Sequence, residues 1–213
     1  MSFKFPKIYP ILDSSFIPAA KRAEFLLRLG CSLAESGVTL LEYRNKTGSM
    51  VELVGDAAIL RAALPVGQVK LILDDRADLV DQIGFDGVHV DAGDLSPTEA
   101  RRLLGPDRIV GTFAGGDALL PGILHAPADY FAIGPVYATT TKRTDKLPIG
   151  SEGVRRLREH AGPGVVLTAA AGITLESAPL VLAAGATTVA VSAALFRTLD
   201  PAAEFRRWME VLK

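Results

Sequence analysis

Residues 129–142 read DYFAIGPVYATTTK, and this stretch decides the fold. Its first part, residues 130–133, is a run of apolar, β-forming side chains, as expected of a strand that is buried on both faces. Such strands belong to parallel sheets that are covered by helices. Gly134 and Pro135 end the strand, and hydroxyl groups and a lysine follow. This loop is suited to holding an anion with N–H, O–H and ammonium groups, although a polar surface loop is the alternative.

Short apolar runs of the same kind recur along the whole chain, and a helical pattern follows each of them. The runs lie at residues 8–12, 38–43, 69–73, 87–90, 108–113, 165–170 and 187–191. The clearest helix start is the capping box Ser96-Pro97-Thr98-Glu99. We also expect helices from Pro18, after Ser49, through Leu79, Val80 and Ile83, at residues 117–125, after Gly150, after a Thr174 cap and from Pro201.

Eight β-then-α units fit in the 213 residues. Strict alternation of this kind requires parallel strands with helical crossovers. An open, doubly wound sheet is the alternative, but no G-x-G-x-x-G opens the chain and eight units favour closure. The sequence therefore predicts an α/β protein with a (β/α)8 TIM barrel, formed as a single domain by residues 1–213.

Composition limits the possible functions. The formal net charge of −1 gives no support for a nucleic-acid partner. The chain lacks the long apolar run of a membrane span, and its first residues lack the apolar core of a signal peptide. The single Cys31 fits a reducing compartment, because it cannot form an internal disulfide. We expect a cytoplasmic protein that acts on small molecules, without nucleic-acid or membrane partners, and leave open a homo-oligomer.

The expected strand ends share a composition that points to phosphate chemistry. Active sites of TIM barrels lie at the C-terminal ends of the strands. The polar and glycine residues at these ends are Glu42, Arg44, Lys46, Asp74, Asp75, Arg76, Asp91, Asp94, Thr139, Thr141, Lys142, Gly172 and Ser192. Carboxylates can hold a hard cation while Arg and Lys bind the remaining phosphate charge. This pattern predicts a site for a magnesium-bridged diphosphate, and we interpret the neighbouring His89 as a structural residue.

With these residues laid out, the chain resembles the thiamine-phosphate synthase family over nearly its full length. LEYRNK at residues 41–46 is similar to the family's Q-x-R-x-K, and DDR at residues 74–76 to its N-D-R. GVHVDAGD at residues 87–94 resembles G-V-H-x-G-Q-x-D. The most specific match is GPVYATTTK at residues 134–142, against G-P-V-F-x-T-x-T-K. Gly172-Ile173 and residues 189–192 match the phosphate-binding strand ends more loosely.

The resemblance implies a transferase that joins hydroxymethylpyrimidine diphosphate to thiazole phosphate and releases diphosphate by a dissociative, Mg²⁺-assisted substitution. It implies that Asp75 and Asp94 are the magnesium ligands. Arg44, Lys46 and Lys142 would bind the diphosphate as catalytic residues. The resemblance places the remaining substrate contacts at Glu42, Tyr43, Asn45, Asp74, Phe113, Thr139, Thr140, Thr141, Gly172, Val191 and Ser192.

Four positions depart from the family pattern. Glu42 replaces a glutamine and Asp74 an asparagine, so each adds a negative charge beside the diphosphate unless it is paired. Phe113 replaces a serine that touches the diphosphate, and Ala171 replaces the first glycine of a pair at the thiazole phosphate. These changes leave open a non-catalytic relative or a barrel enzyme for another phosphorylated ligand. Residues 112–116 lack the histidine of the related thiazole tautomerases, which disfavours that activity.

Overall fold

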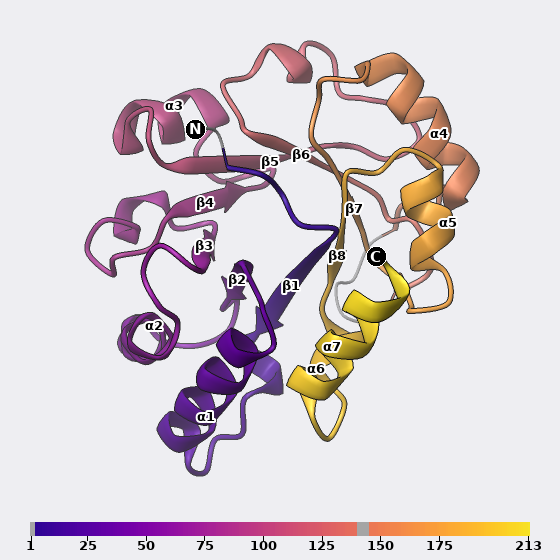
Figure 1. Ribbon diagram of the computed structural model, residues 1–213. Coiled ribbons are helices and arrows are strands. Elements are labelled where there is room, and N and C mark those ends of the chain that lie inside the picture. Colours follow the sequence, from indigo (N-terminus) through magenta and orange to yellow (C-terminus); the bar gives the residue numbers. More distant parts are fainter. Residues whose placement is uncertain (1–2, 140–144) are drawn as a thin grey trace.

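The protein is described by a computed structural model that covers residues 3–139 and 145–213. Its parallel strands form one closed barrel, in which the order around the barrel is the order along the chain (Figure 1). The strands are β1 (Ile8–Asp13), β2 (Leu40–Arg44), β3 (Lys70–Asp74), β4 (Gly87–Val90), β5 (Ile109–Gly115), β6 (Tyr130–Ile133), β7 (Leu167–Ala170) and β8 (Thr188–Val191). The predicted TIM barrel is confirmed.

Helices surround the barrel on its outside (Figure 1). The α-helices are α1 (Arg22–Glu35), α2 (Met50–Ala63), α3 (Pro97–Leu104), α4 (Gly150–Ala161), α5 (Ala178–Ala183), α6 (Ala193–Phe196) and α7 (Pro201–Val211). The short 3-10 helices among the described residues are η1 (Ser14–Phe16), η2 (Ala77–Leu79) and η3 (Ile123–His125). No helix in the described part of the chain is long and apolar enough to cross a membrane.

Some predicted helices were wrong in extent. The segment through Ile83 forms only η2, which is followed by turns that end at Gly84, where φ is 69°. Residues 117–125 form only η3, since Gly122 adopts a φ of 70° immediately before it. The first helix begins at Arg22 rather than at Pro18.

The helix after β7 begins later than its expected Thr174 cap. Pro179 occupies its first turn, the part of a helix where a missing N–H has no cost. The N-cap is Ser177, and Thr174 instead closes the preceding turn by accepting and donating hydrogen bonds with that serine.

Two layers of apolar packing position the cavity described below. Outward-facing strand residues pack under the helices in the main core. Inside the barrel, Tyr9, Leu40, Ile72, Ile109 and Tyr130 form a second cluster. The close packing of this cluster is evident at Gly111, where an added Cβ would lie 1.9 Å from Cζ of Tyr130. The N-terminal half of the barrel is therefore filled by side chains, and a hollow remains only toward the C-terminal strand ends.

Candidate active site

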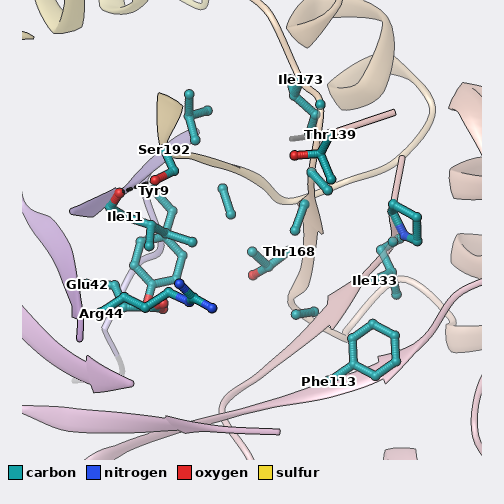
Figure 2. A pocket seen from close by; sticks show the side chains of 18 of the residues that line it. Tyr9, Ile11, Glu42, Arg44, Phe113, Ile133, Thr139, Thr168, Ile173 and Ser192 are labelled. Carbon is teal, nitrogen blue, oxygen red and sulfur yellow. Dashed lines mark hydrogen bonds between the residues drawn. The ribbon is translucent and has the colours of Figure 1, made fainter. Parts of the chain in front are cut away.

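A cavity of about 490 Å³ opens at the C-terminal ends of the strands, and all eight strands contribute to its wall. Glu42 and Arg44 lie on one side of it, and Phe113 and Ile133 lie on the other (Figure 2). A charged wall on β2 and β3 thus faces a largely apolar wall on β5 to β8. The strand-end position agrees with the location of active sites in TIM barrels.

Two cations and three carboxylates interlock on the charged wall. Arg44 pairs with Asp13, and its Nε lies 3.3 Å from Oδ2 of Asp74. The Nζ of Lys46 lies 3.1 Å from the same Asp74 oxygen and also contacts Asp75. Although burial lowers it, the charges of Asp74 and Asp75 hold the pKa of Lys46 above its ordinary value. The aspartate that departs from the family pattern therefore has two cationic partners.

The same cluster sets the ionisation of Asp74. Burial raises its pKa to about 6, and the charge of Asp75 acts in the same direction. Lys46 and Arg44 oppose this shift. Near pH 7 the carboxylate is therefore mostly ionised and neutralised by its neighbours.

A hydrogen-bonded chain of four side chains forms the cavity floor. The Tyr9 hydroxyl donates to Oε2 of Glu42 at 2.8 Å and lies 3.0 Å from the Tyr130 hydroxyl. The Tyr130 hydroxyl lies 3.0 Å from Nδ1 of His89, whose ring stacks on that of Tyr130. Since each hydroxyl has one proton, Tyr130 donates to Tyr9 and the Nδ1–H of His89 donates to Tyr130. The structural interpretation of His89 is consistent with this arrangement.

Glu42 is almost completely excluded from water in this chain. Burial is the largest cause that raises its pKa to about 8, and the charge of Asp74 adds to the rise. The hydrogen bond from Tyr9 and the charge of Arg44 oppose it. Glu42 is therefore largely protonated at pH 7, so it adds little negative charge to the site.

Asp75 and Asp94, the predicted magnesium ligands, follow β3 and β4 and line one surface hollow beside the main cavity. Within the described residues, Oδ1 of Asp75 is buried and has no hydrogen-bond partner. Burial raises the pKa of Asp94, and the adjacent Asp75 raises it further. The negative charges of the two carboxylates thus repel each other, and a bound divalent cation would relieve this repulsion.

The wall at β5 and β6 carries a cation that the sequence did not indicate. The Nζ of Lys146 lies 4.0 Å from the centre of the Phe113 ring. Both residues line the cavity, together with Thr139. Where the family pattern has a serine hydroxyl, this chain thus has the Phe113 ring in contact with the ammonium group of Lys146. The predicted contacts Thr140, Thr141 and Lys142 lie outside the described residues.

The ends of β7 and β8 lie at the cavity, and the residues that follow β7 adopt left-handed backbone conformations. Gly172 has a φ of 68°, and a Cβ there would lie 2.4 Å from the carbonyl oxygen of Ala138. Ala171 has a φ of 75°, a conformation that favours glycine. Val191 and Ser192 line the cavity, and the Ser192 hydroxyl donates 2.6 Å to the carbonyl of Ile11. That hydroxyl therefore links β8 to β1.

Two predicted substrate contacts lie elsewhere. Tyr43 points away from the barrel interior, because side chains alternate along β2, and its hydroxyl donates to Asp56 on α2. Asn45 donates to the Tyr43 hydroxyl at 3.1 Å and accepts from the Gly48 N–H at 2.7 Å. Neither lines the cavity. Their structural role is to hold the loop that carries Lys46.

Comparison with known proteins agrees with this geometry. The family model described as thiamine monophosphate synthase matches residues 8–195. The chain belongs to the thiamine-phosphate synthase family. A thiamine-phosphate synthase of Koribacter versatilis is 39% identical over 209 residues, covering 98% of this chain and 97% of the relative. One of Agrobacterium fabrum is 36% identical over 197 residues, covering 91% and 88%.

Solved structures support the fold of this thiamine-phosphate synthase family member. A thiamine phosphate pyrophosphorylase from Pyrococcus furiosus superposes with a TM-score of 0.78 at 23% identity, covering 97% of this chain and 95% of that one. Another, from Bacteroides thetaiotaomicron, gives a TM-score of 0.69 at 14% identity, covering 97% and 98%. At these identities the likeness concerns the barrel alone.

Sequence reasoning missed several cavity residues of this family member. They are Tyr9, Tyr130, Lys146 and Thr168, to which Asp13 is added as the partner of the cavity residue Arg44. Asp13 follows directly after the first apolar run, so its position at a strand exit was a usable signal. The tyrosines gave no such signal, because each lies within an apolar run.

Proposed function

We propose that this chain condenses hydroxymethylpyrimidine diphosphate with thiazole phosphate, giving thiamine phosphate and diphosphate. The observation that carries this proposal is the convergence of Arg44 and Lys46 on one rim of the cavity, where Lys46 also contacts Asp75 of the adjoining hollow. Cations at the rim suit the diphosphate, and the apolar wall suits the two heterocycles. The family membership makes this the reaction to test first.

The reaction requires charge neutralisation more than proton transfer. The bond between the pyrimidine methylene carbon and the diphosphate oxygen breaks, and the electron pair leaves with the diphosphate. The thiazole nitrogen then donates its lone pair to the methylene carbon. Arg44 and Lys46 stabilise the departing charge, and the cavity holds the two rings in line. No side chain has to remove a proton in either step.

The residues present fit a magnesium ion. Asp75 offers a buried carboxylate oxygen without a hydrogen-bond partner, and Asp94 offers a second carboxylate beside it. No set of three His, Cys, Asp or Glu residues in the described segments forms a metal site. The pair Asp75 and Asp94 matches the way Mg²⁺ binds, through one or two carboxylates together with substrate phosphates. When bound, the ion would neutralise charge on the diphosphate.

The surroundings of the residues that depart from the family pattern favour an active enzyme over a non-catalytic relative. Glu42 is largely protonated near pH 7, and Asp74 is paired with Arg44 and Lys46. Neither therefore presents an uncompensated negative charge to the diphosphate. Lys146 adds a cation where Phe113 has removed a hydroxyl group.

Several assignments remain part of this proposal. Lys142 would contribute to diphosphate binding. The thiazole phosphate would be held by the loop after β6 and by the ends of β7 and β8, where the proposed contacts are Thr139, Thr140, Thr141, Gly172, Val191 and Ser192. A cytoplasmic location and small-molecule partners complete the proposal.

The test is a turnover assay with the purified protein, both substrates and magnesium, followed by chromatographic detection of thiamine phosphate. We expect product to form only when both substrates are present. An Arg44→Ala variant purified in parallel controls for a contaminating enzyme. Product no greater than in a reaction without protein would reject the proposed function.

A further inference from the structure

Two buried threonines inside the barrel lack hydrogen-bond partners among the described residues. The Oγ1 atoms of Thr168 on β7 and Thr188 on β8 are both in this state. The two residues are direct neighbours in the register of these strands, and both side chains are essentially inaccessible. A buried hydroxyl without a partner lowers stability, and a valine of the same shape would avoid that cost.

The two threonines differ in one respect: Thr168 lines the cavity and Thr188 does not. Within β7 and β8, both fully described, the other residues of the cavity wall are Ala170, Ala190 and Val191. Thr168 is therefore the polar side chain of an otherwise apolar wall. Figure 2 shows it projecting into the space between Glu42 and Ile133.

The depth of Thr168 indicates which part of a ligand it meets. It lies two residues before Ala170, the last residue of β7, a distance of about 7 Å along the strand from the cavity rim. Under the proposed function the phosphate groups would lie at the rim, beside Arg44 and Lys46, so that a ring atom of the substrate would lie nearer to Thr168. An aminopyrimidine carries two ring nitrogens and an amino group. A thiazole ring carries one nitrogen, and that nitrogen forms the new bond.

We propose that the Thr168 hydroxyl is a specificity-determining contact that hydrogen-bonds the aminopyrimidine ring of the diphosphate substrate. This assignment rests on the proposed function. It explains why a hydroxyl group is kept on the apolar wall without a partner of its own. Thr188 carries the same unpartnered hydroxyl outside the cavity and provides a matched control.

The experiment compares wild type with Thr168→Val, Thr188→Val and Thr168→Ser. Steady-state kinetics gives the KM for each substrate, and calorimetry gives the Kd of the pyrimidine diphosphate in the absence of thiazole phosphate. Thermal melting reports on folding. Thr168→Ala provides a second hydroxyl-free variant in case the valine variant is poorly folded.

We expect Thr168→Val to raise the KM and Kd for the pyrimidine diphosphate by about 3- to 10-fold, the loss of one neutral hydrogen bond. Thr168→Ser should restore both constants, and Thr188→Val should change neither by more than about twofold. Neither valine variant should lower the Tm, because each removes an unpartnered hydroxyl.

Three outcomes would overturn the assignment: unchanged pyrimidine constants in Thr168→Val, an equal effect in Thr188→Val, or an effect confined to thiazole phosphate. Absence of turnover in wild type would instead reject the proposed function. In that case the calorimetric comparison of Thr168→Val with Thr188→Val still tests the contact.

Discussion

Tyr9 donates a 2.8 Å hydrogen bond to Oε2 of Glu42, which joins β1 to a carboxyl group that the barrel removes from water. Burial is the main cause that raises the pKa of Glu42 to about 8. An unfolded glutamate ionises near pH ~4.3. Between these values the folded state holds a proton that the unfolded state has lost. Glu42 therefore lowers stability progressively as the pH rises through this range.

Glu42→Gln should remove this pH-dependent loss, because glutamine has the same shape and stays neutral. Relative to wild type, the variant should gain about 1–4 kcal/mol in free energy of unfolding between pH 5.5 and 8.5. Urea unfolding at both pH values measures the gain. Glu35→Gln, at an exposed position, is the control and should show none. Parallel pH dependence in Glu42→Gln and wild type would contradict the burial argument.

Arg44→Ala should strongly reduce activity, because it removes a diphosphate contact and leaves Asp13 and Asp74 without their shared partner. We expect kcat/KM to fall by about a hundredfold or more, corresponding to ~2.7 kcal/mol of lost transition-state stabilisation. Arg44→Lys should recover only part, since an ammonium group cannot reproduce the planar guanidinium contacts. Steady-state kinetics measures both, with Lys21→Ala on the exposed surface as the control.

The fold could be predicted because strands buried on both faces leave a simple signal. The apolar runs at residues 87–90 and 130–133 coincide with β4 and β6. Parallel strands under helices have no solvent face, so nothing interrupts these runs. Residues 117–125 were harder, because a weak helical pattern there is overridden by the backbone conformation at Gly122.

The charged wall was also predictable, while the cavity floor was not. Arg44, Lys46 and Asp74 stand at strand ends, where sequence position alone implies proximity in a barrel. The contact between Tyr9 and Tyr130 joins residues separated by 121 positions, and it depends on side-chain direction inside the barrel. Tyr43 was predicted as a substrate contact, but it alternates with Glu42 and Arg44 along β2, and its side chain therefore faces α2.

The double variant Glu42→Gln with Asp74→Asn tests whether the added carboxylates are already compensated. Uncompensated charges would repel the diphosphate, so their removal would lower the KM for the pyrimidine diphosphate. The pairing of Asp74 with Arg44 and Lys46, and the protonation of Glu42, lead us to expect an unchanged or higher KM. Kinetics at pH 7 measures it, and each single variant serves as a control. A KM several-fold lower would show that the charges repel the substrate.

Asp94→Asn should weaken magnesium binding, because it removes one of the two proposed ligands, Asp75 and Asp94, in the hollow beside β3 and β4. We expect the magnesium concentration for half-maximal activity to rise by about 10-fold or more, and chelation to abolish wild-type turnover. Calorimetric titration of magnesium in the presence of diphosphate gives a readout independent of turnover. Asp107→Asn, at an exposed position outside this hollow, is the control. Equal magnesium requirements in the two variants would exclude Asp94 as a ligand.

Ala171→Gly should stabilise the protein. The φ of 75° at Ala171 lies in the left-handed region, where a Cβ costs about 1 kcal/mol and glycine has no such penalty. Part of this gain is offset by the greater freedom of glycine in the unfolded chain. We therefore expect the Tm to rise by about 1–3 °C. Ala169→Gly, two residues earlier on β7 with ordinary strand geometry, is the control and should lower the Tm. A lower Tm in both variants would mean that the packing of the Ala171 methyl group outweighs its backbone strain.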